Sequence, residues 1–267
     1  MTGWLHVRRS DAPLILAMPH GGTVIPDNLL PTYGSAWHAR RDADWHIADL
    51  YARLAEATVV ATDISRSVID VNRDPSGASL YPGQATTELC PTTDFDGAPL
   101  YLHDIPDAVL IERRREAYFA PYHEALATEI SRLRARHPRV VVYDCHSIRS
   151  VIPRLFDGEL PELNIGSNGG TTCAPALVDA VAAVAAGRSH VVDGRFRGGW
   201  TTRHYGRPAD GVHAIQMEIA IRAYLREPAV PSPENWPPPY DSTFAAPLRG
   251  TLAQILATAT SFAMEPS

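Results

Sequence analysis

The stretch that decides the fold is Arg139-Val-Val-Val-Tyr143, which is followed at once by the polar segment Asp144-Cys-His-Ser147. A short, uninterrupted apolar run of this kind is typical of a β-strand that is buried on both faces. Further strands are predicted at residues 14–18, 58–64, 162–166 and 213–219. Helices are predicted at residues 42–57, 107–136, 174–186 and 248–264, with a long irregular excursion at 72–102. The alternation predicts an α/β, three-layer sandwich with a mixed, largely parallel sheet.

The composition is that of an ordinary globular protein, because 45% of the 267 residues are apolar and 20% are charged, with a formal net charge of −6. Mild acidity argues against a nucleic-acid partner, which would require a basic face. The apolar stretches are too short to span a bilayer, so no membrane partner is expected. The N-terminus lacks the apolar core of a signal peptide, and three cysteines make no disulfide framework. We therefore expect a single cytoplasmic domain over residues 1–267. These features do not predict its oligomeric state.

Ligands of such sheets bind beyond the carboxyl ends of the strands, so the segments that follow the strands predict the site. His20 follows the first predicted strand and His146 follows the third. Hydrolytic zinc takes three protein ligands of N or O type and leaves a fourth position for water. The two histidines therefore predict a divalent metal site. Asp44 is the expected third ligand, with Asp42 and His46 as alternatives.

Glu218 lies among apolar residues of a predicted strand, where a carboxylate is costly unless it is paired or functional. It is therefore expected to be a general base that deprotonates water, with a salt bridge to Arg222 as the structural alternative. The two-residue period of a strand places Asp144 on the same face as His146, where it can orient the imidazole. Cys145 faces the opposite side, which argues against a thiol nucleophile.

Three arginines lie in segments that end or flank predicted strands: Arg66, Arg73 and Arg203. Guanidinium groups bind carboxylates in a bidentate manner, so these positions predict a ligand that carries carboxylates. Surface salt bridges are the alternative explanation for any one of them.

Taken together, the motifs resemble those of the N-formylglutamate amidohydrolases. The stretches that carry the resemblance are Pro19-His-Gly-Gly22, Arg41-Asp-Ala-Asp-Trp-His46, Arg66, Val71-Asn-Arg-Asp74, Asp144-Cys-His-Ser147, Asn164-Ile-Gly166, Gly198-Gly-Trp-Thr-Thr-Arg-His-Tyr-Gly206 and His213-Ala-Ile-Gln-Met-Glu218. They span roughly residues 13–226 in one order.

The resemblance implies a zinc-carboxypeptidase-like (phosphorylase/hydrolase-like) fold and hydrolysis of N-formyl-L-glutamate to formate and L-glutamate, the last step of one route of histidine degradation. It departs from the carboxypeptidases at Thr23, which stands where they place a glutamate ligand. The alternatives are a related amidohydrolase or carboxypeptidase that acts on another N-acyl amino acid, or a non-catalytic dicarboxylate-binding protein.

The site expected from the residues and the resemblance has three parts. Glu218 and Arg66 are expected to be catalytic, as the base and the cation that stabilises the oxyanion. One divalent ion, expected to be zinc, is held by three ligands, and a small anionic N-acyl amino acid is bound by four further residues. The expected ligands are His20, Asp44 and His146, and the expected substrate-binding residues are Asn72, Arg73, Arg203 and His204.

Overall fold

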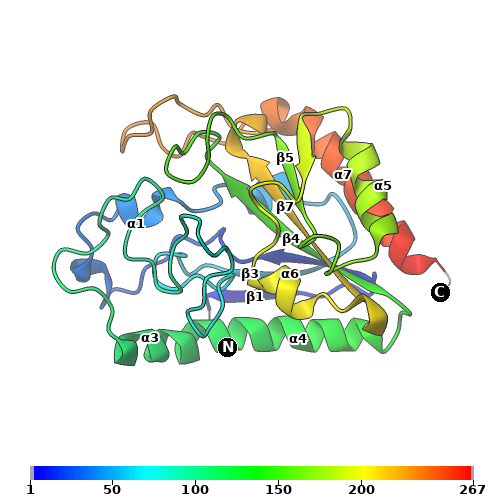
Figure 1. The fold of residues 1–267 in the computed structure, drawn as a ribbon, viewed down its shortest axis with the longest axis horizontal. Helices are drawn as coiled ribbons and strands as arrows, with labels where there is room; N and C mark the ends of the chain where they lie inside the picture. The colour runs from blue at the N-terminus through cyan, green and yellow to red at the C-terminus, as the bar shows by residue number, and fades with distance from the viewer. Residues whose placement is uncertain (1–2, 266–267) are drawn as a thin grey trace.

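The computed structural model describes residues 3–265 and contains a seven-stranded sheet (Figure 1). The strands are β1 (Leu5–Arg8), β2 (Leu14–Met18), β3 (Thr58–Thr62), β4 (Val140–Ile148), β5 (Leu163–Gly166), β6 (His190–Val192) and β7 (Val212–Ala220). Their order across the sheet is β1-β3-β2-β4-β7-β5-β6. The four central strands β3, β2, β4 and β7 are parallel, whereas β1 and β5 are antiparallel to their inner neighbours. The predicted mixed, largely parallel sheet is confirmed.

Helices cover both faces of the sheet, which confirms the predicted three-layer sandwich (Figure 1). They are α1 (His38–Arg41), α2 (Ile47–Tyr51), α3 (Ala108–Arg114), α4 (Ala120–Arg134), α5 (Pro175–Ala185), α6 (Trp200–Tyr205) and α7 (Ser242–Met264). Short 3₁₀ helices lie at Leu30–Thr32, Pro208–Asp210 and Ile221–Ala223. Helices α2, α5 and α7 pack on one face and α4 on the other. Within residues 3–265, no helix combines the length and apolar character that a bilayer crossing requires.

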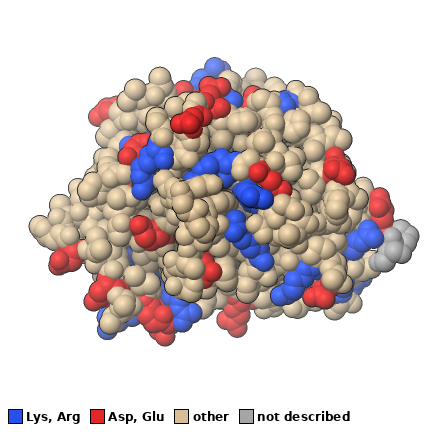
Figure 2. Space-filling view, in the orientation of Figure 1, with Lys and Arg blue, Asp and Glu red and all other residues tan. Residues whose placement is uncertain are grey.

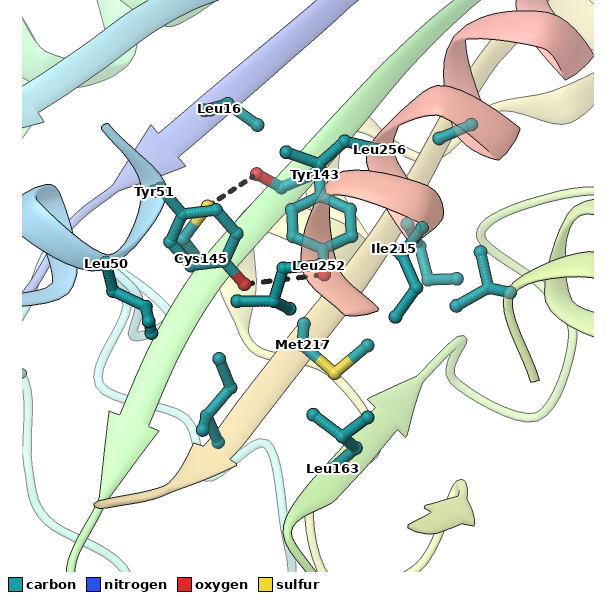
Figure 3. Packing of buried hydrophobic residues seen from close by; sticks show 14 of the residues in the cluster. Leu16, Leu50, Tyr51, Tyr143, Cys145, Leu163, Ile215, Met217, Leu252 and Leu256 are labelled. Carbon is teal, nitrogen blue, oxygen red and sulfur yellow. Dashed lines mark hydrogen bonds between the residues drawn. The ribbon is translucent and has the colours of Figure 1, made fainter. Parts of the chain in front are cut away.

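The core is built on β4 and β7, whose nine residues each are all buried. Alternate side chains of β4 enter the two apolar layers, so Tyr143 and Cys145 face α7 while Val142 faces α4. Figure 3 shows Leu252 and Leu256 of α7 in the same apolar layer as Tyr143 and Cys145. Burying one large aliphatic side chain stabilises a fold by about 1.5–3 kcal/mol, so this layered packing holds the two strands in fixed register. Cys145 is buried on the face away from the predicted site, as expected.

The predicted helix at 42–57 is wrong. α1 ends at Arg41, α2 covers only Ile47–Tyr51, and His46 between them has φ +59°. A residue in this left-handed conformation cannot continue an α-helix, so the chain turns there instead. Strand β4 also runs on through His146 to Ile148, so that this histidine lies within the strand rather than after it.

Strands β1 and β6 and helix α6 were not expected from the sequence, because all three are short and the strands are poorly buried. The predicted helix at 107–136 is present as α3, a π-helical turn (Arg115–Phe119) and α4. The turn ends two residues before Pro121, which has no N–H to donate to a regular helical bond. The segment at 72–102 contains no regular strand or helix, as predicted, but it buries side chains such as Tyr81 and Phe95.

Candidate active site

Three buried side chains from separate elements converge on one point. His20 lies in the loop after β2, Asp44 lies between α1 and α2, and His146 lies on β4. The Nδ1 atoms of the two imidazoles are 3.1 Å apart. Asp44 Oδ2 is 3.3 Å from Nδ1 of His146 and 3.9 Å from Nδ1 of His20. Two nitrogens and one carboxylate oxygen thus face a common centre.

The backbone around these residues explains how they meet. The amide of Asp44 donates to the carbonyl of His20, and the amide of Ser147 on β4 donates to Asp44 Oδ2 at 3.1 Å. Gly22 lets the His20 loop lie directly against the chain after β3, because a Cβ there would be 2.2 Å from the backbone of Asp63. The loop after β2 is therefore tied to both neighbouring strands.

A carboxylate stands behind each imidazole and determines which ring nitrogen carries the proton. Nε2 of His20 donates to Asp70 Oδ1 at 2.6 Å, and Nε2 of His146 lies 2.9 Å from Asp144 Oδ2 and 2.9 Å from the side-chain amide nitrogen of Asn72. Both Nδ1 atoms are then unprotonated in the neutral rings and aim their lone pairs at the common centre. Metal-ligating histidines almost always have such a partner on the second nitrogen.

This donor set fits a divalent ion of the zinc type. Bonds of about 2.0–2.1 Å to a tetrahedral ion place its ligand atoms roughly 3.3–3.4 Å apart, close to the observed separations. Asp44 Oδ1 is buried and accepts no hydrogen bond from the described residues. Burial lowers the pKa of His146, but Asp144 and Asp44 outweigh it and raise this pKa well above its usual value. The site thus favours a positive charge between the carboxylates of Asp44 and Asp144.

Both alternative ligands lie elsewhere. Asp42 Oδ2 accepts a hydrogen bond from the amide of Phe95 at 2.6 Å, and Oδ1 faces Arg149. His46 is partly exposed, and its ring faces Asp49 at 3.2 Å. The structure therefore brings Asp44, rather than Asp42 or His46, to the two histidines.

A cavity of about 550 Å³, including its open mouth, lies beside this cluster. The sheet forms its floor, and the 72–102 segment and the loop after β6 form its walls. It is lined by His20, Arg66, Asn72, Arg73, Tyr81, Ala85, Thr86, Thr87, Phe95, His146, Ile148, Leu155, Arg195, Phe196, Gly199, Gln216 and Glu218. Six of the nine residues predicted from the sequence are among them, and Asp44 lies behind His20 and His146.

Glu218 enters the cavity from β7, directly beside His146 of β4 in the register of the sheet. Burial raises its pKa to about 7. The predicted alternative, a salt bridge with Arg222, is wrong because Arg222 pairs with Glu159 at 3.1 Å. Glu218 thus has the position and the proton affinity of a general base.

Arg66 and Arg73 are arranged around Asp70, the carboxylate that supports His20. Arg66 donates to Asp70 Oδ2 at 2.8 Å and stacks on Phe95, with its centre 4.8 Å from the ring. Arg73 lies 3.6 Å from the same oxygen and donates to the carbonyl and hydroxyl of Thr87. Asn72 donates to Asp144 Oδ2 and accepts from the amide of Thr201, which links it to the support of His146.

Two predicted substrate-binding residues do not line this cavity. Arg203 of α6 donates to the carbonyls of Gly198 and Leu80 and stacks on Tyr81. His204 stacks on Trp200, with ring centroids 4.8 Å apart. Their expected role in substrate binding therefore stays a prediction, and Arg203 contacts the cavity only through the ring of Tyr81.

Arg195 lines the cavity and was missed by the sequence reasoning. It lies between the short strand β6 and α6, neither of which was expected. The sequence signal was the loop Gly194-Arg-Phe-Arg-Gly198, in which arginines alternate with an aromatic residue between two glycines.

Comparison with known proteins agrees with this geometry. The sequence profile of the N-formylglutamate amidohydrolase family matches residues 12–225. The chain belongs to this family. It is 43% identical over 231 residues to an N-formylglutamate deformylase of Pseudomonas aeruginosa, covering 84% of this chain and 86% of that protein. It is 41% identical over 258 residues to an N-formylglutamate deformylase of Pseudomonas putida, covering 94% of each.

Structural comparison supports the same fold for this N-formylglutamate amidohydrolase family member. The crystal structure of an N-formylglutamate amidohydrolase from Ralstonia eutropha superposes with a TM-score of 0.76 at 22% identity, covering 97% of this chain and 98% of that one. The matched range 12–225 contains every residue of the cluster and the cavity described above. The predicted family and enzyme class are confirmed, and the chain is an amidohydrolase.

Proposed function

We propose that the chain hydrolyses N-formyl-L-glutamate to formate and L-glutamate, with one divalent ion, zinc by preference, held by His20, Asp44 and His146. The observation that carries the proposal is the meeting of this His-Asp-His cluster with Glu218 at the floor of an arginine-lined cavity. The names of the two Pseudomonas relatives support the choice of substrate.

A divalent ion at the cluster would supply Lewis acidity, which lowers the pKa of water and polarises a carbonyl group. Glu218 accepts a proton from the attacking water as its oxygen bonds to the formyl carbon. When the carbon–nitrogen bond breaks, Glu218 donates that proton to the departing nitrogen, so formate and the free amine leave. A carboxylate whose pKa is about 7 is suited to both transfers near neutral pH.

Arg66 is the group proposed to stabilise the negative charge that develops on the formyl oxygen. Its guanidinium is nearly buried, is held by Asp70 and lies 3.7 Å from Asp44 Oδ1. A fixed cation in a site shielded from water stabilises such a charge without reorganisation during the reaction.

Arg73 is proposed to bind a carboxylate of the substrate. Its Nε and Nη2 atoms are held by Thr87, which orients the remaining N–H groups in the cavity wall. Asn72 lines the same wall, and its side-chain amide is proposed to bind the substrate together with Arg73. We further propose that residues 1–267 act as one cytoplasmic domain on small anionic N-acyl amino acids, with no nucleic-acid or membrane partner.

The deciding experiment is a formate-release assay combined with metal analysis of the purified protein. N-formyl-L-glutamate, N-acetyl-L-aspartate and a dipeptide ending in glutamate are compared at equal concentration. Release of formate, with turnover of the other two at least 10²-fold lower and near one equivalent of zinc, is the expected result. Faster turnover of either comparison compound would replace the proposed substrate.

A further inference from the structure

The Arg195 guanidinium is a cavity group to which the proposed reaction gives no task. Its Nε donates to the carbonyl of Leu155 and its Nη2 to the carbonyl of Ala85, both at 2.7 Å. Burial and the nearby Arg73 lower the pKa of Arg195, whereas Tyr81 and the Glu218 carboxylate raise it. Since arginine stays protonated in proteins, its guanidinium presents a positive charge to the cavity.

The same guanidinium is held in one orientation. Its centre lies 5.4 Å from the ring of Tyr81 and 5.3 Å from that of Phe196, and the Tyr81 hydroxyl donates to the carbonyl of Gly198. Two backbone acceptors and two aromatic faces leave Nη1 as the nitrogen available to a ligand. Such preorganisation lowers the entropy lost when a carboxylate binds.

Arg66 and Arg73 differ from Arg195 in their surroundings. Both face Asp70, the carboxylate behind His20, so they lie close to the metal cluster. Arg195 is anchored instead on the cavity wall, at Ala85 and Leu155. The cavity therefore offers two separately anchored guanidinium groups for carboxylates, one beside Asp70 and one on the wall at Ala85 and Leu155.

We infer that Arg195 binds the side-chain carboxylate of the acyl amino acid and so determines the preference for an acidic side chain. This inference rests on the proposed function. The α-carboxylate is attached to the carbon that carries the scissile nitrogen, so it belongs at Arg73, and the distal carboxylate reaches Arg195. Figure 2 shows a group of basic side chains near the centre of the face viewed, and because the chain contains no lysine they are arginines.

The test compares Arg195→Met with the unaltered enzyme on N-formyl-L-glutamate and on N-formyl-L-glutamine, which replaces only the distal carboxylate by an amide. The unaltered enzyme is expected to prefer the first substrate. Arg195→Met is expected to lower kcat/KM for N-formylglutamate by about 30- to 100-fold, mainly through KM, because a buried charge-assisted hydrogen bond is lost. The value for N-formylglutamine is expected to stay within about threefold, so the preference disappears.

Arg139→Met is the matched comparison, because Arg139 also stacks on an aromatic ring, that of Phe262, and donates to a backbone carbonyl but does not line the cavity. It is expected to change kcat/KM for both substrates by the same small factor. Loss of the preference in Arg139→Met, or an equal loss for both substrates in Arg195→Met, would overturn the inference. If Arg195→Met does not fold, Arg195→Lys replaces it, with an expected loss of about tenfold for N-formylglutamate alone.

A binding measurement separates this inference from the proposed reaction. Calorimetry on the zinc-loaded protein compares glutarate with glutaramate, its half-amide. Glutarate is expected to bind at least tenfold more tightly, and Arg195→Met is expected to remove the difference. Absence of formate release from the unaltered enzyme would reject the proposed function, while this binding result would still decide the role of Arg195. An unchanged difference in Arg195→Met would overturn that role.

Discussion

At the scale of single residues, the site depends on pairs in which a carboxylate orients the group in front of it. Asp70 and Asp144 each lie within 3 Å of Nε2 of a histidine, on the side of the ring away from the two Nδ1 atoms that face the common centre. Asp70 also holds Arg66, so one buried carboxylate serves the metal ligand and the cation proposed for the oxyanion. Asp70 and Asp144 therefore help to hold the proposed metal ligands and the proposed oxyanion cation in place.

Replacing the proposed base by its amide separates chemistry from metal binding. Glu218→Gln is expected to keep the metal content and to lower kcat by about 10²–10⁴-fold, because the amide cannot accept the proton of water. Formate release and metal analysis are measured on the same sample. Glu162→Gln is the control, since Glu162 pairs with Arg188 and does not line the cavity. Full activity of Glu218→Gln would remove Glu218 from the mechanism.

Substitutions of the three candidate third ligands give a second prediction. Asp44→Asn is expected to weaken zinc binding by about 10²-fold or more, because a charged donor that faces both imidazoles is lost. Asp42→Asn and His46→Asn are expected to retain one equivalent of zinc, since neither side chain faces the centre. Zinc affinity is measured by competition with a chromophoric chelator. If Asp42→Asn loses zinc and Asp44→Asn retains it in full, Asp42 and not Asp44 is the third ligand.

At the scale of elements, the register between β4 and β7 brings a proposed metal ligand and the proposed base together. His146 and Glu218 are direct neighbours in this pairing, on two strands whose nine residues are all buried. The loop after β6 then packs against the 72–102 segment through Gly199, whose amide donates to Gln216. A Cβ on Gly199 would lie 2.4 Å from the Asn72 side-chain amide.

Gly199→Ala is therefore predicted to disturb the site through packing. The added methyl group must displace Asn72, which supports Asp144, and overpacking of this kind costs about 1–3 kcal/mol of stability. We expect kcat/KM to fall about tenfold or more and urea unfolding to shift to lower concentration. Gly250→Ala in α7 is the control, since no atom lies within 4 Å of its Cβ position, and it is expected to stabilise by about 0.5–1 kcal/mol. Normal activity of Gly199→Ala would show that Asn72 can move without consequence.

At the scale of the whole molecule, the His-Asp-His cluster joins parts of the chain that are far apart in sequence. Its three residues come from the loop after β2, the turn before α2 and strand β4, and all three are buried. An ion held there binds the folded state and not the unfolded chain, so its binding contributes directly to global stability.

Removal of the ion is therefore expected to lower Tm. At a zinc concentration 100 times Kd, binding stabilises by about 2.7 kcal/mol, which corresponds to roughly 5–11 °C for a domain of this size. The melting of zinc-loaded, chelator-treated and zinc-restored protein is compared by calorimetry. Asp44→Asn is expected to melt at nearly the same temperature in all three conditions. Equal Tm values for unaltered protein with and without zinc would contradict the proposed ligand set.

The sequence by itself determined the alternation of buried strands and helices and most of the site, because apolar runs and the polar residues at their ends are local patterns. His20, His146, Glu218, Arg66 and Arg73 follow from that pattern. Only the tertiary structure showed that Arg195 lines the cavity. Arg195 lies in the loop between Gly194 and Gly198, and the packing of this loop against Tyr81 brings its guanidinium into the cavity. Such short elements are stabilised by neighbours distant in the chain, so no local pattern encodes them.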